Sequence, residues 1–249
     1  MTNYGLQLFS VRDITPKDLD GALAAVAKAG YTSVEFAGFF DHPASEVKAM
    51  LERYGLVASG THTGLDQLAP DKIHDTVAYH LAIGCHDLIV PAFGDQDREE
   101  SLNKTVEILN YAQPILAEAG ITLGFHNHSG EFYTQPYGKV IFDELHARTN
   151  VHFELDTFWA WNAGVDPVAL MRRLHAEGRL HVIHLKDGHK GVNGQRAIGK
   201  SSGLGDAPVE AVRACALELG VHMVVESEGL DPTGIEEVTR CMDFLRTLN

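Results

Sequence analysis

Short runs of apolar and β-branched residues alternate along this chain with longer stretches in which apolar residues recur every three or four positions. The short runs predict strands, and the longer stretches predict amphipathic helices. The expected strands are residues 4–8, 33–36, 57–61, 87–90, 122–125, 151–155, 182–185 and 223–225. The expected helices are residues 18–28, 44–54, 71–83, 101–119, 139–148, 166–177, 208–219 and 232–248. Strands that alternate with helices in this way indicate a parallel sheet.

Glycine follows most of the predicted helices, as at Gly30, Gly55 and Gly84, and this residue commonly ends a helix in the left-handed conformation. Eight strand–helix units in about 250 residues fit a (β/α)8 barrel. An open, doubly wound sheet is the alternative, and it would place a glycine-rich phosphate loop after the first strand. Residues 9–13 contain no glycine. We therefore expect an α/β protein that is a single (β/α)8 TIM barrel, with residues 1–249 forming one domain.

Composition narrows the classes of function. The 249 residues are 45% hydrophobic and 22% charged, which is ordinary for a globular protein. Acidic residues outnumber basic ones by 34 to 20 without a lysine or arginine cluster, so no nucleic-acid partner is expected. Three widely separated cysteines predict no disulfide framework. No apolar run reaches about 18 residues and no signal peptide is visible, so we expect a cytoplasmic protein without membrane contact.

Polar and ionisable residues gather at the carboxyl ends of the predicted strands, where the active sites of barrels lie. They are Gln7, Glu35, His62, His126, Asn127, His128, Glu131, Glu154, Asp156, His184, Lys186, Asp187, Glu226 and Glu228. Carboxylates and imidazoles that converge from different strands suit a divalent cation such as Mn, Mg, Co or Zn. Buried carboxylates also repel one another, so they need a cation or raised pKa values. The pattern therefore predicts a metal site at the mouth of the barrel.

Structural roles compete with these functional ones. A single histidine at a strand end is more often a hydrogen-bonded structural residue, but several strand ends that carry acids or histidines favour a site. Glu154 precedes Asp156 by two residues, so both side chains are expected to face inward, and Glu154 is a candidate for orienting a metal ligand. Trp159 and Trp161 are either core residues or platforms on which a sugar ring stacks.

Residues 188–205 form the longest predicted connection without a helix or strand. Such long, glycine-rich loops are typical of lids or disordered segments. Arg196 and Lys200 in this loop either meet an anionic group or point into solvent.

The chain resembles the sugar phosphate isomerase/epimerase superfamily, also called the xylose isomerase-like TIM barrels. The motifs that carry the resemblance follow one another along nearly the whole chain and are together specific for the superfamily. They are Gly-Leu-Gln-Leu-Phe-Ser-Val-Arg-Asp at 5–13, Val-Glu-Phe at 34–36, His-Asn-His-Ser-Gly-Glu-Phe at 126–132, Glu-Leu-Asp-Thr-Phe-Trp at 154–159, His-Leu-Lys-Asp at 184–187, Gly-Leu-Gly-Asp at 203–206 and Val-Glu at 225–226.

The resemblance implies one divalent metal ion, held by residues from strands five to eight. The ligands that it implies are Glu131, Asp156, His184 and Glu226. The ligand from strand five is the open position. Ketose epimerases of the family end that strand in a glutamate, where this chain has His126, so His126 and His128 are the alternatives to Glu131. The three-metal endonucleases of the superfamily have more histidine ligands, and the acidic charge of this chain argues against that activity.

The resemblance also suggests roles for the remaining residues. The catalytic candidates are His126, His128, Lys186 and Glu35, and the candidates for substrate binding are Gln7, Arg12, His62 and Trp159. Trp159 stands where the epimerases have a histidine, which weakens a direct transfer of the epimerase mechanism.

Members of the superfamily share the removal of a proton next to a carbonyl, with a metal that stabilises the enediolate. The resemblance therefore implies a metal-dependent isomerase or epimerase that acts on a keto-sugar or related polyol. One alternative is a lyase or dehydratase that eliminates a β-oxygen from a keto-sugar or 3-keto-glycoside, as an inosose dehydratase does. Another is a sugar-binding barrel without turnover. The expected partner is a small-molecule sugar, and a homo-oligomer is possible.

Overall fold

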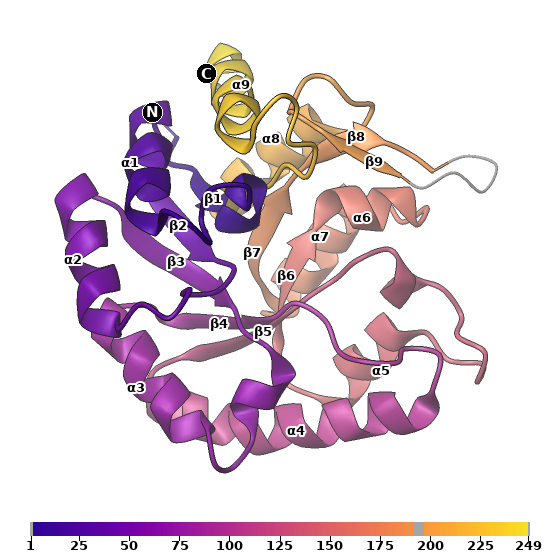
Figure 1. Ribbon diagram of the computed structural model, residues 1–249. Helices are drawn as coiled ribbons and strands as arrows, with labels where there is room; N and C mark the ends of the chain where they lie inside the picture. The colour runs from indigo at the N-terminus through magenta and orange to yellow at the C-terminus, as the bar shows by residue number, and fades with distance from the viewer. Residues whose placement is uncertain (1, 192–196, 249) are drawn as a thin grey trace.

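The computed structural model describes residues 2–191 and 197–248. Eight parallel strands form a closed barrel, and helices surround it (Figure 1). The barrel strands are β1 (Gly5–Gln7), β2 (Ser33–Phe36), β3 (Val57–His62), β4 (Asp87–Val90), β5 (Thr122–His126), β6 (His152–Asp156), β7 (Leu180–Leu185) and β10 (His222–Val225). They pair in chain order, and β10 closes the barrel against β1. The predicted (β/α)8 barrel is confirmed.

Apart from α6, the α-helices lie close to their predicted positions. They are α1 (Leu19–Ala29), α2 (Ala44–Tyr54), α3 (Ile73–Ile83), α4 (Glu99–Glu118), α5 (Ile141–Arg148), α6 (Thr157–Asn162), α7 (Pro167–Ala176), α8 (Val209–Leu219) and α9 (Gly234–Thr247). Short 3-10 helices are η1 (Leu8–Val11), η2 (Leu65–Leu68) and η3 (Gly130–Phe132). The last helix, α9, packs beside α1 and completes the ring around the barrel (Figure 1). No helix in the described part of the chain has the length and apolarity needed to cross a bilayer.

Local sequence signals explain where these helices begin and end. The side chains of Asp18 and Asp166 accept hydrogen bonds from the first backbone N–H groups of α1 and α7. Gly30 and Gly55 end α1 and α2 with φ values of 108° and 65°, in the left-handed region that favours glycine. The glycine signals read from the sequence therefore mark real helix ends.

Alternation along the strands separates the core from the site. In β6, Leu155 is buried in the apolar layer between strands and helices, whereas Glu154 and Asp156 on either side of it point the opposite way. The same alternation in β7 places His184 inside and Leu185 among the core residues. The apolar layer therefore fixes which polar side chains enter the mouth of the barrel.

Two features were not predicted. Residues 157–162 form α6, which begins at Asp156, because its carboxylate accepts a hydrogen bond from the backbone N–H of Trp159 at 2.8 Å. The expectation that residues 188–205 lack regular structure was wrong for the described part, where β8 (Asp187–His189) and β9 (Ile198–Lys200) form an antiparallel hairpin. Arg196 lies outside the described residues, and Lys200 is half-buried.

The carboxylate of Asp187 anchors the segment that follows β7. Its Oδ1 accepts hydrogen bonds from the backbone N–H groups of Gly188 and Ala207, at 2.8 and 3.1 Å. Its Oδ2 accepts from Gly203 and Gly205, at 2.8 and 3.0 Å. A Cβ at Gly205 would lie 2.2 Å from the carboxylate, so only glycine fits there. The loop is thus wrapped around a buried anion that the chain itself supplies.

Asp187→Ala is expected to lower the free energy of unfolding by on the order of 3 kcal/mol, because several backbone N–H groups lose their acceptor together. Urea unfolding followed by circular dichroism measures the change. Asp206→Ala is the matched control, since Asp206 belongs to the same loop but its side chain is 69% exposed. Equal losses of stability in the two variants would contradict this role for Asp187.

Candidate active site

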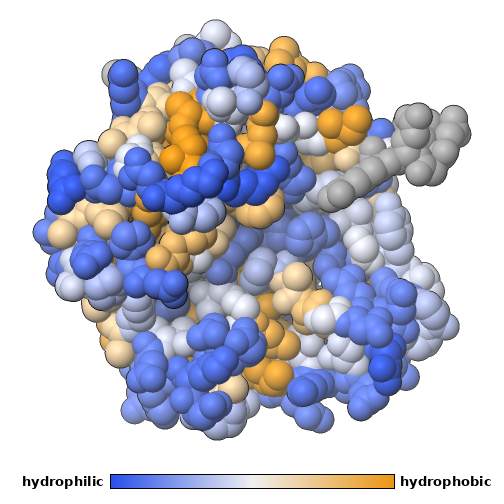
Figure 2. All heavy atoms as spheres, in the orientation of Figure 1, coloured by the Kyte–Doolittle hydropathy of each residue, from blue (hydrophilic) through white to orange (hydrophobic). Residues whose placement is uncertain are grey.

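A cavity of about 290 Å³ opens at the carboxyl ends of the barrel strands. It is lined by Phe9, Ala37, His62, Pro91, His126, His128, Glu226 and Glu228. Figure 2 shows a hollow near the middle of the face that Figure 1 presents, with hydrophilic and hydrophobic residues around it. Several of the predicted site residues therefore share one cavity.

His184 lies fully buried beneath this mouth and contacts carboxylates with both ring nitrogens. Its Nε2 lies 2.8 Å from Glu35 Oε1 and 3.2 Å from Glu154 Oε2. Its Nδ1 lies 3.3 Å from Glu226 Oε2 and 3.9 Å from Asp156 Oδ2. One imidazole thus joins two pairs of carboxylates, which come from β2, from β6 and from the end of β10.

Two groups of convergent donors share His184. The histidine group consists of His62, His126, Glu154 and His184, and the acidic group consists of Asp156, His184 and Glu226. Within each group the donor atoms lie within 4.8 Å of one another. The acidic group therefore brings together the three predicted metal ligands from β6, from β7 and from the end of β10.

The acidic group has the chemistry of a cation site. Asp156 Oδ2 is buried and has no hydrogen-bond partner among the described residues. Burial raises the pKa of Asp156 to about 7, although the ammonium of Lys186, 3.6 Å from Oδ2, acts to lower it. Two carboxylate donors and one imidazole suit Mn, Mg, Co or Zn. The residues present therefore fit a divalent ion.

In the histidine group, Glu154 is the central acceptor. Its Oε2 lies 2.6 Å from His62 Nε2 and 2.9 Å from His126 Nδ1. Its other oxygen, Oε1, is buried without a partner among the described residues. Burial and the neighbouring charge of Glu35 raise the pKa of Glu154. This arrangement supports the expectation that Glu154 orients surrounding imidazoles.

Glu35 is held on the opposite side of the mouth. Gln7 donates from Nε2 to Glu35 Oε1 at 2.5 Å, and His62 Nε2 lies 3.1 Å from the same oxygen. Burial alone would raise the pKa of Glu35, but the imidazoles of His62 and His184 outweigh it and hold the value well below the usual range. Burial lowers the pKa of His62, yet Glu35 and Glu154 raise it to about 10. The charged forms of Glu35 and His62 are therefore stabilised by each other and by the neighbouring side chains.

Lys186 extends the charge network toward the last strand. Its Nζ donates to Glu226 Oε2 at 3.0 Å and to Glu228 Oε1 at 2.6 Å, and the side chain is fully buried. The ammonium lies 4.6 Å from the ring centroid of Trp159. Trp159 is itself buried, and its Nε1 has no hydrogen-bond partner among the described residues. The indole therefore belongs to the floor of the site and keeps an unused donor.

Glu131 lies outside both groups of convergent donors. Its Oε2 accepts a hydrogen bond from the backbone N–H of His128 at 2.8 Å, and its Oε1 accepts from Gln96 Nε2 at 2.7 Å. His128 Nδ1 lies 4.0 Å from Glu131 Oε1, and the side chain of His128 is 46% exposed. The assignment of Glu131 as the ligand from strand five stays a prediction, and His126, which belongs to the histidine group, is the alternative that lies nearer to His184.

The structure brings Gln7 close to the other site residues but ties Arg12 to the backbone. Gln7 accepts from the Phe9 N–H while donating to Glu35, so its amide orients that carboxylate. The Arg12 guanidinium donates to the carbonyl oxygens of Phe9 and Glu228, at 2.9 and 2.8 Å. Both residues therefore hold neighbouring groups in place.

Some lining residues escaped the sequence analysis because they are apolar or lie in loops. Phe9, Ala37 and Pro91 line the cavity, and Gln96 fixes Glu131. Phe9, Ala37 and Pro91 each stand within two residues of the end of a strand, which is the signal that could have identified them.

Comparisons with known proteins agree with this geometry. The family model for the xylose isomerase-like TIM barrel matches residues 23–248. The chain is 28% identical over 198 residues to 2-oxo-tetronate isomerase from Haemophilus influenzae, covering 69% of this chain and 76% of that protein. A sugar phosphate isomerase/epimerase structure from Parabacteroides distasonis gives a TM-score of 0.79 at 25% identity, covering 99% of this chain and 98% of that one. A probable 3-DHS dehydratase from Bacillus anthracis shares the fold, with a TM-score of 0.74 at 14% identity over 100% of both chains.

The purified protein is expected to hold one divalent ion, and Asp156→Ala is expected to lower its affinity for the ion by at least about tenfold, because a ligand oxygen is lost. Elemental analysis of protein dialysed against metal-free buffer measures the content. Glu210→Ala, a change on α8 away from the mouth, is the control.

The same measurement on His126→Ala, His128→Ala and Glu131→Gln tests the ligand from strand five. The variant that loses the ion identifies the residue. A wild-type protein that holds only a small fraction of an ion, with no difference in Asp156→Ala, would refute the metal site.

Proposed function

Because the chain belongs to the xylose isomerase-like TIM barrel family, we propose that it is a metal-dependent isomerase or epimerase of a keto-sugar or related polyol. The observation that carries this proposal is the acidic group, whose buried donors converge beneath a cavity that is also lined by His126 and His128. The Haemophilus influenzae relative, named as an isomerase of 2-oxo-tetronate, supports a small hydroxylated carbonyl compound as substrate.

The acidic group would hold the ion through Asp156, His184 and Glu226. A divalent ion bound there supplies Lewis acidity to a substrate carbonyl and compensates the charge that develops when the neighbouring carbon loses a proton. His184 keeps its orientation because its second nitrogen contacts Glu35 and Glu154, which is the usual arrangement behind a metal-bound imidazole.

His126 is the proposed proton acceptor. Glu154 Oε2 accepts the hydrogen bond from Nδ1, so Nε2 is the unprotonated nitrogen of the neutral ring. Burial and the neighbouring cationic imidazoles hold the pKa of His126 well below its usual value, which keeps the ring neutral. His126 lines the cavity, which supports its proposed role in taking a proton from a bound substrate.

Epimerisation also needs a group that acts on the other face of the substrate. His128 is the proposed second group, because it lines the same cavity and is partly exposed. Glu35 is the alternative. Gln7 and His62 both contact its Oε1 and leave Oε2 without a hydrogen bond among the described residues, but Oε2 is buried and lies against Gly60.

Lys186 is proposed to stabilise a substrate oxygen. An ammonium group has three protons to donate, and two of them are directed to Glu226 and Glu228. The ammonium also lies 3.6 Å from Asp156 Oδ2, so it is shared among three carboxylates. The unpartnered Nε1 of Trp159 is the donor that a hydroxyl or enediolate oxygen can satisfy.

The substrate is proposed to lack a phosphate at the usual position. Loops after the seventh and eighth strands of TIM barrels commonly bind phosphate through backbone N–H groups. Here the N–H groups of Gly203, Gly205 and Ala207 already donate to the carboxylate of Asp187. These N–H groups are therefore not available to a phosphate, which favours a substrate without one.

The test is proton exchange in heavy water. A panel of four- to six-carbon ketoses and 2-oxo acids is incubated with metal-loaded protein, and deuterium uptake next to the carbonyl is followed by NMR. We expect uptake with at least one compound, and His126→Ala should reduce its rate by about 10²–10⁴-fold, the usual contribution of a general base. His146→Ala is the control, because this histidine lies on α5 and pairs with Glu177.

The product distinguishes the remaining functions. Deuterium in an isomerised or epimerised sugar supports the proposal, whereas a dehydrated or cleaved product would assign the lyase chemistry for which the Bacillus anthracis protein is named. Binding without exchange or product would refute turnover and leave a sugar-binding barrel.

A further inference from the structure

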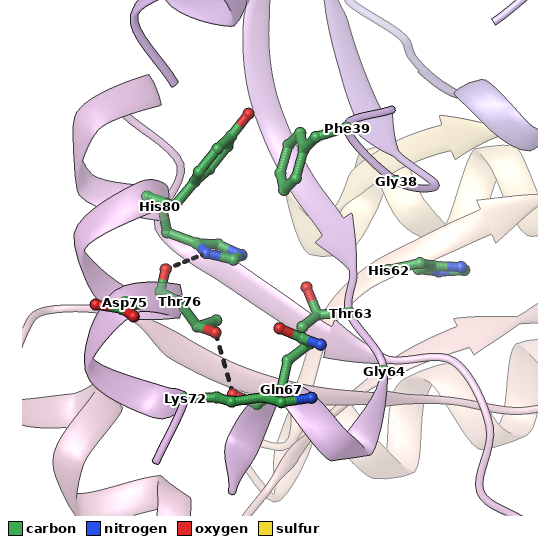
Figure 3. A pocket seen from close by; sticks show the side chains of 11 residues that line it. Gly38, Phe39, His62, Thr63, Gly64, Gln67, Lys72, Asp75, Thr76 and His80 are labelled. Atoms are coloured by element: carbon green, nitrogen blue, oxygen red, sulfur yellow. Dashed lines mark hydrogen bonds between the residues drawn. The ribbon is translucent and has the colours of Figure 1, made fainter. Parts of the chain in front are cut away.

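A second cavity, of about 410 Å³, adjoins the first at the mouth of the barrel (Figure 3). Its walls are the loop after β2, the end of β3 with η2, and one side of α3. The two cavities share His62, whose side chain lines both of them. A ligand that occupied both cavities would therefore contact His62 at the junction.

The sizes of the cavities indicate how they divide a ligand. The first encloses about 290 Å³, near the lower end of the range of about 300–1,000 Å³ for small-molecule sites. That space suits one small sugar unit beside the buried donors. The second is larger, and none of the four catalytic candidates lines it. It suits a part of the ligand that does not react.

A directed chain of hydrogen bonds gives the wall of the second cavity a fixed polarity. His80 Nδ1 donates to the carbonyl oxygen of Thr76 at 2.7 Å, because a carbonyl can only accept. Burial lowers the pKa of His80, so the ring is neutral and Nε2 accepts from the hydroxyl of Thr61 at 2.7 Å. Thr61 in turn accepts from the hydroxyl of Thr63 at 2.8 Å. The hydroxyl hydrogen of Thr63 is therefore used in the hydrogen bond to Thr61. The Thr63 oxygen can accept a hydrogen bond from a ligand in the cavity.

An aromatic pair forms another part of the wall. The rings of Phe39 and Tyr79 have centroids 4.2 Å apart, and Figure 3 shows Phe39 above the space between His80 and His62. The Tyr79 hydroxyl already donates to the carbonyl oxygen of His42 at 2.7 Å. The wall therefore presents aromatic carbon atoms on one side and the Thr63 oxygen on another. A sugar ring matches both, because its apolar face can pack on an aromatic ring and its hydroxyl groups can donate hydrogen bonds.

The charges on the wall do not favour an anionic ligand. Lys72 Nζ is paired with Asp66 Oδ2 at 2.8 Å, and Asp75 also lines the cavity. His62 lies between Glu35 and Glu154. A phosphate is usually bound by cationic donors that are not already paired with a carboxylate. Because Lys72 is paired with Asp66, this wall suits an uncharged ligand.

We propose that the second cavity is a subsite for a further sugar ring, so that the substrate is a disaccharide or glycoside rather than a free monosaccharide. The reacting unit occupies the first cavity, the linkage passes His62, and the second unit packs on Phe39 with a hydroxyl donating to Thr63. This inference rests on the proposed function, because that function places a sugar in the first cavity.

Calorimetric titration tests the subsite without requiring turnover. Glucose, methyl β-glucoside, trehalose, sucrose, maltose and cellobiose are titrated into the metal-loaded protein. We expect at least one disaccharide to bind about tenfold more tightly than glucose, the gain that roughly one additional hydrogen bond with its packing supplies. The gain should disappear in Thr63→Val and Phe39→Ala, while affinity for glucose stays within about twofold of the wild-type value.

The matched controls are Thr239→Val on α9 and Tyr111→Ala on α4, which remove a hydroxyl and an aromatic ring outside both cavities. Thermal unfolding of each variant confirms that it is folded before titration. Equal affinity for glucose and every disaccharide, no binding of any disaccharide, or a gain that survives both variants would overturn the subsite.

The two proposals fail separately. A disaccharide gain that depends on Thr63 and Phe39, in a protein that shows no proton exchange, would support the subsite and refute the isomerase. Exchange with free ketoses, without any disaccharide gain, would support the isomerase and refute the subsite.

Discussion

The burial of charge at the mouth of the barrel is the constraint on which the rest of this structure depends. An isolated buried carboxylate or imidazolium is costly, so each must be compensated by a partner of opposite charge. His184 does this for two sides at once, since Nε2 contacts Glu35 and Glu154 while Nδ1 contacts Glu226 and approaches Asp156. Oδ2 of Asp156 has no hydrogen bond among the described residues and faces only the more distant cations of Lys186 and His184, at 3.6 and 3.9 Å, and this is the place that a divalent ion suits.

The end of β7 connects this chemistry to the architecture of the loops. Within four residues, His184 and Lys186 enter the site, Leu185 enters the core, and Asp187 collects the backbone N–H groups of the following loop. The hairpin and the approach to α8 are thus fixed by a side chain next to the site. Residues 184–187 therefore contribute charged groups to the mouth of the barrel and also fix the loop beside it.

His62 has a corresponding position on the other side of the mouth. It contacts the carboxylates of Glu35 and Glu154, and it lines both cavities. The second cavity is built largely from neutral groups, including the chain from Thr63 to His80 and the aromatic pair. Charged groups therefore surround the position proposed for the reaction, and neutral, directional groups surround the position proposed for the rest of the substrate.

The sequence by itself determined the barrel, because the period of apolar residues and the glycine helix ends depend only on local geometry. It also brought Asp156, His184 and Glu226 to one mouth, since parallel strands that alternate with helices all end on the same side. It did not reveal that Arg12 holds backbone carbonyls, that Glu131 is bound by Gln96, or that Asp187 accepts hydrogen bonds from the backbone of the loop after it. Those contacts join segments that no local pattern connects, and the second cavity arises where the loop after β2, the end of β3 and α3 meet. Only the tertiary structure decided them, because no local periodicity specifies which loops meet.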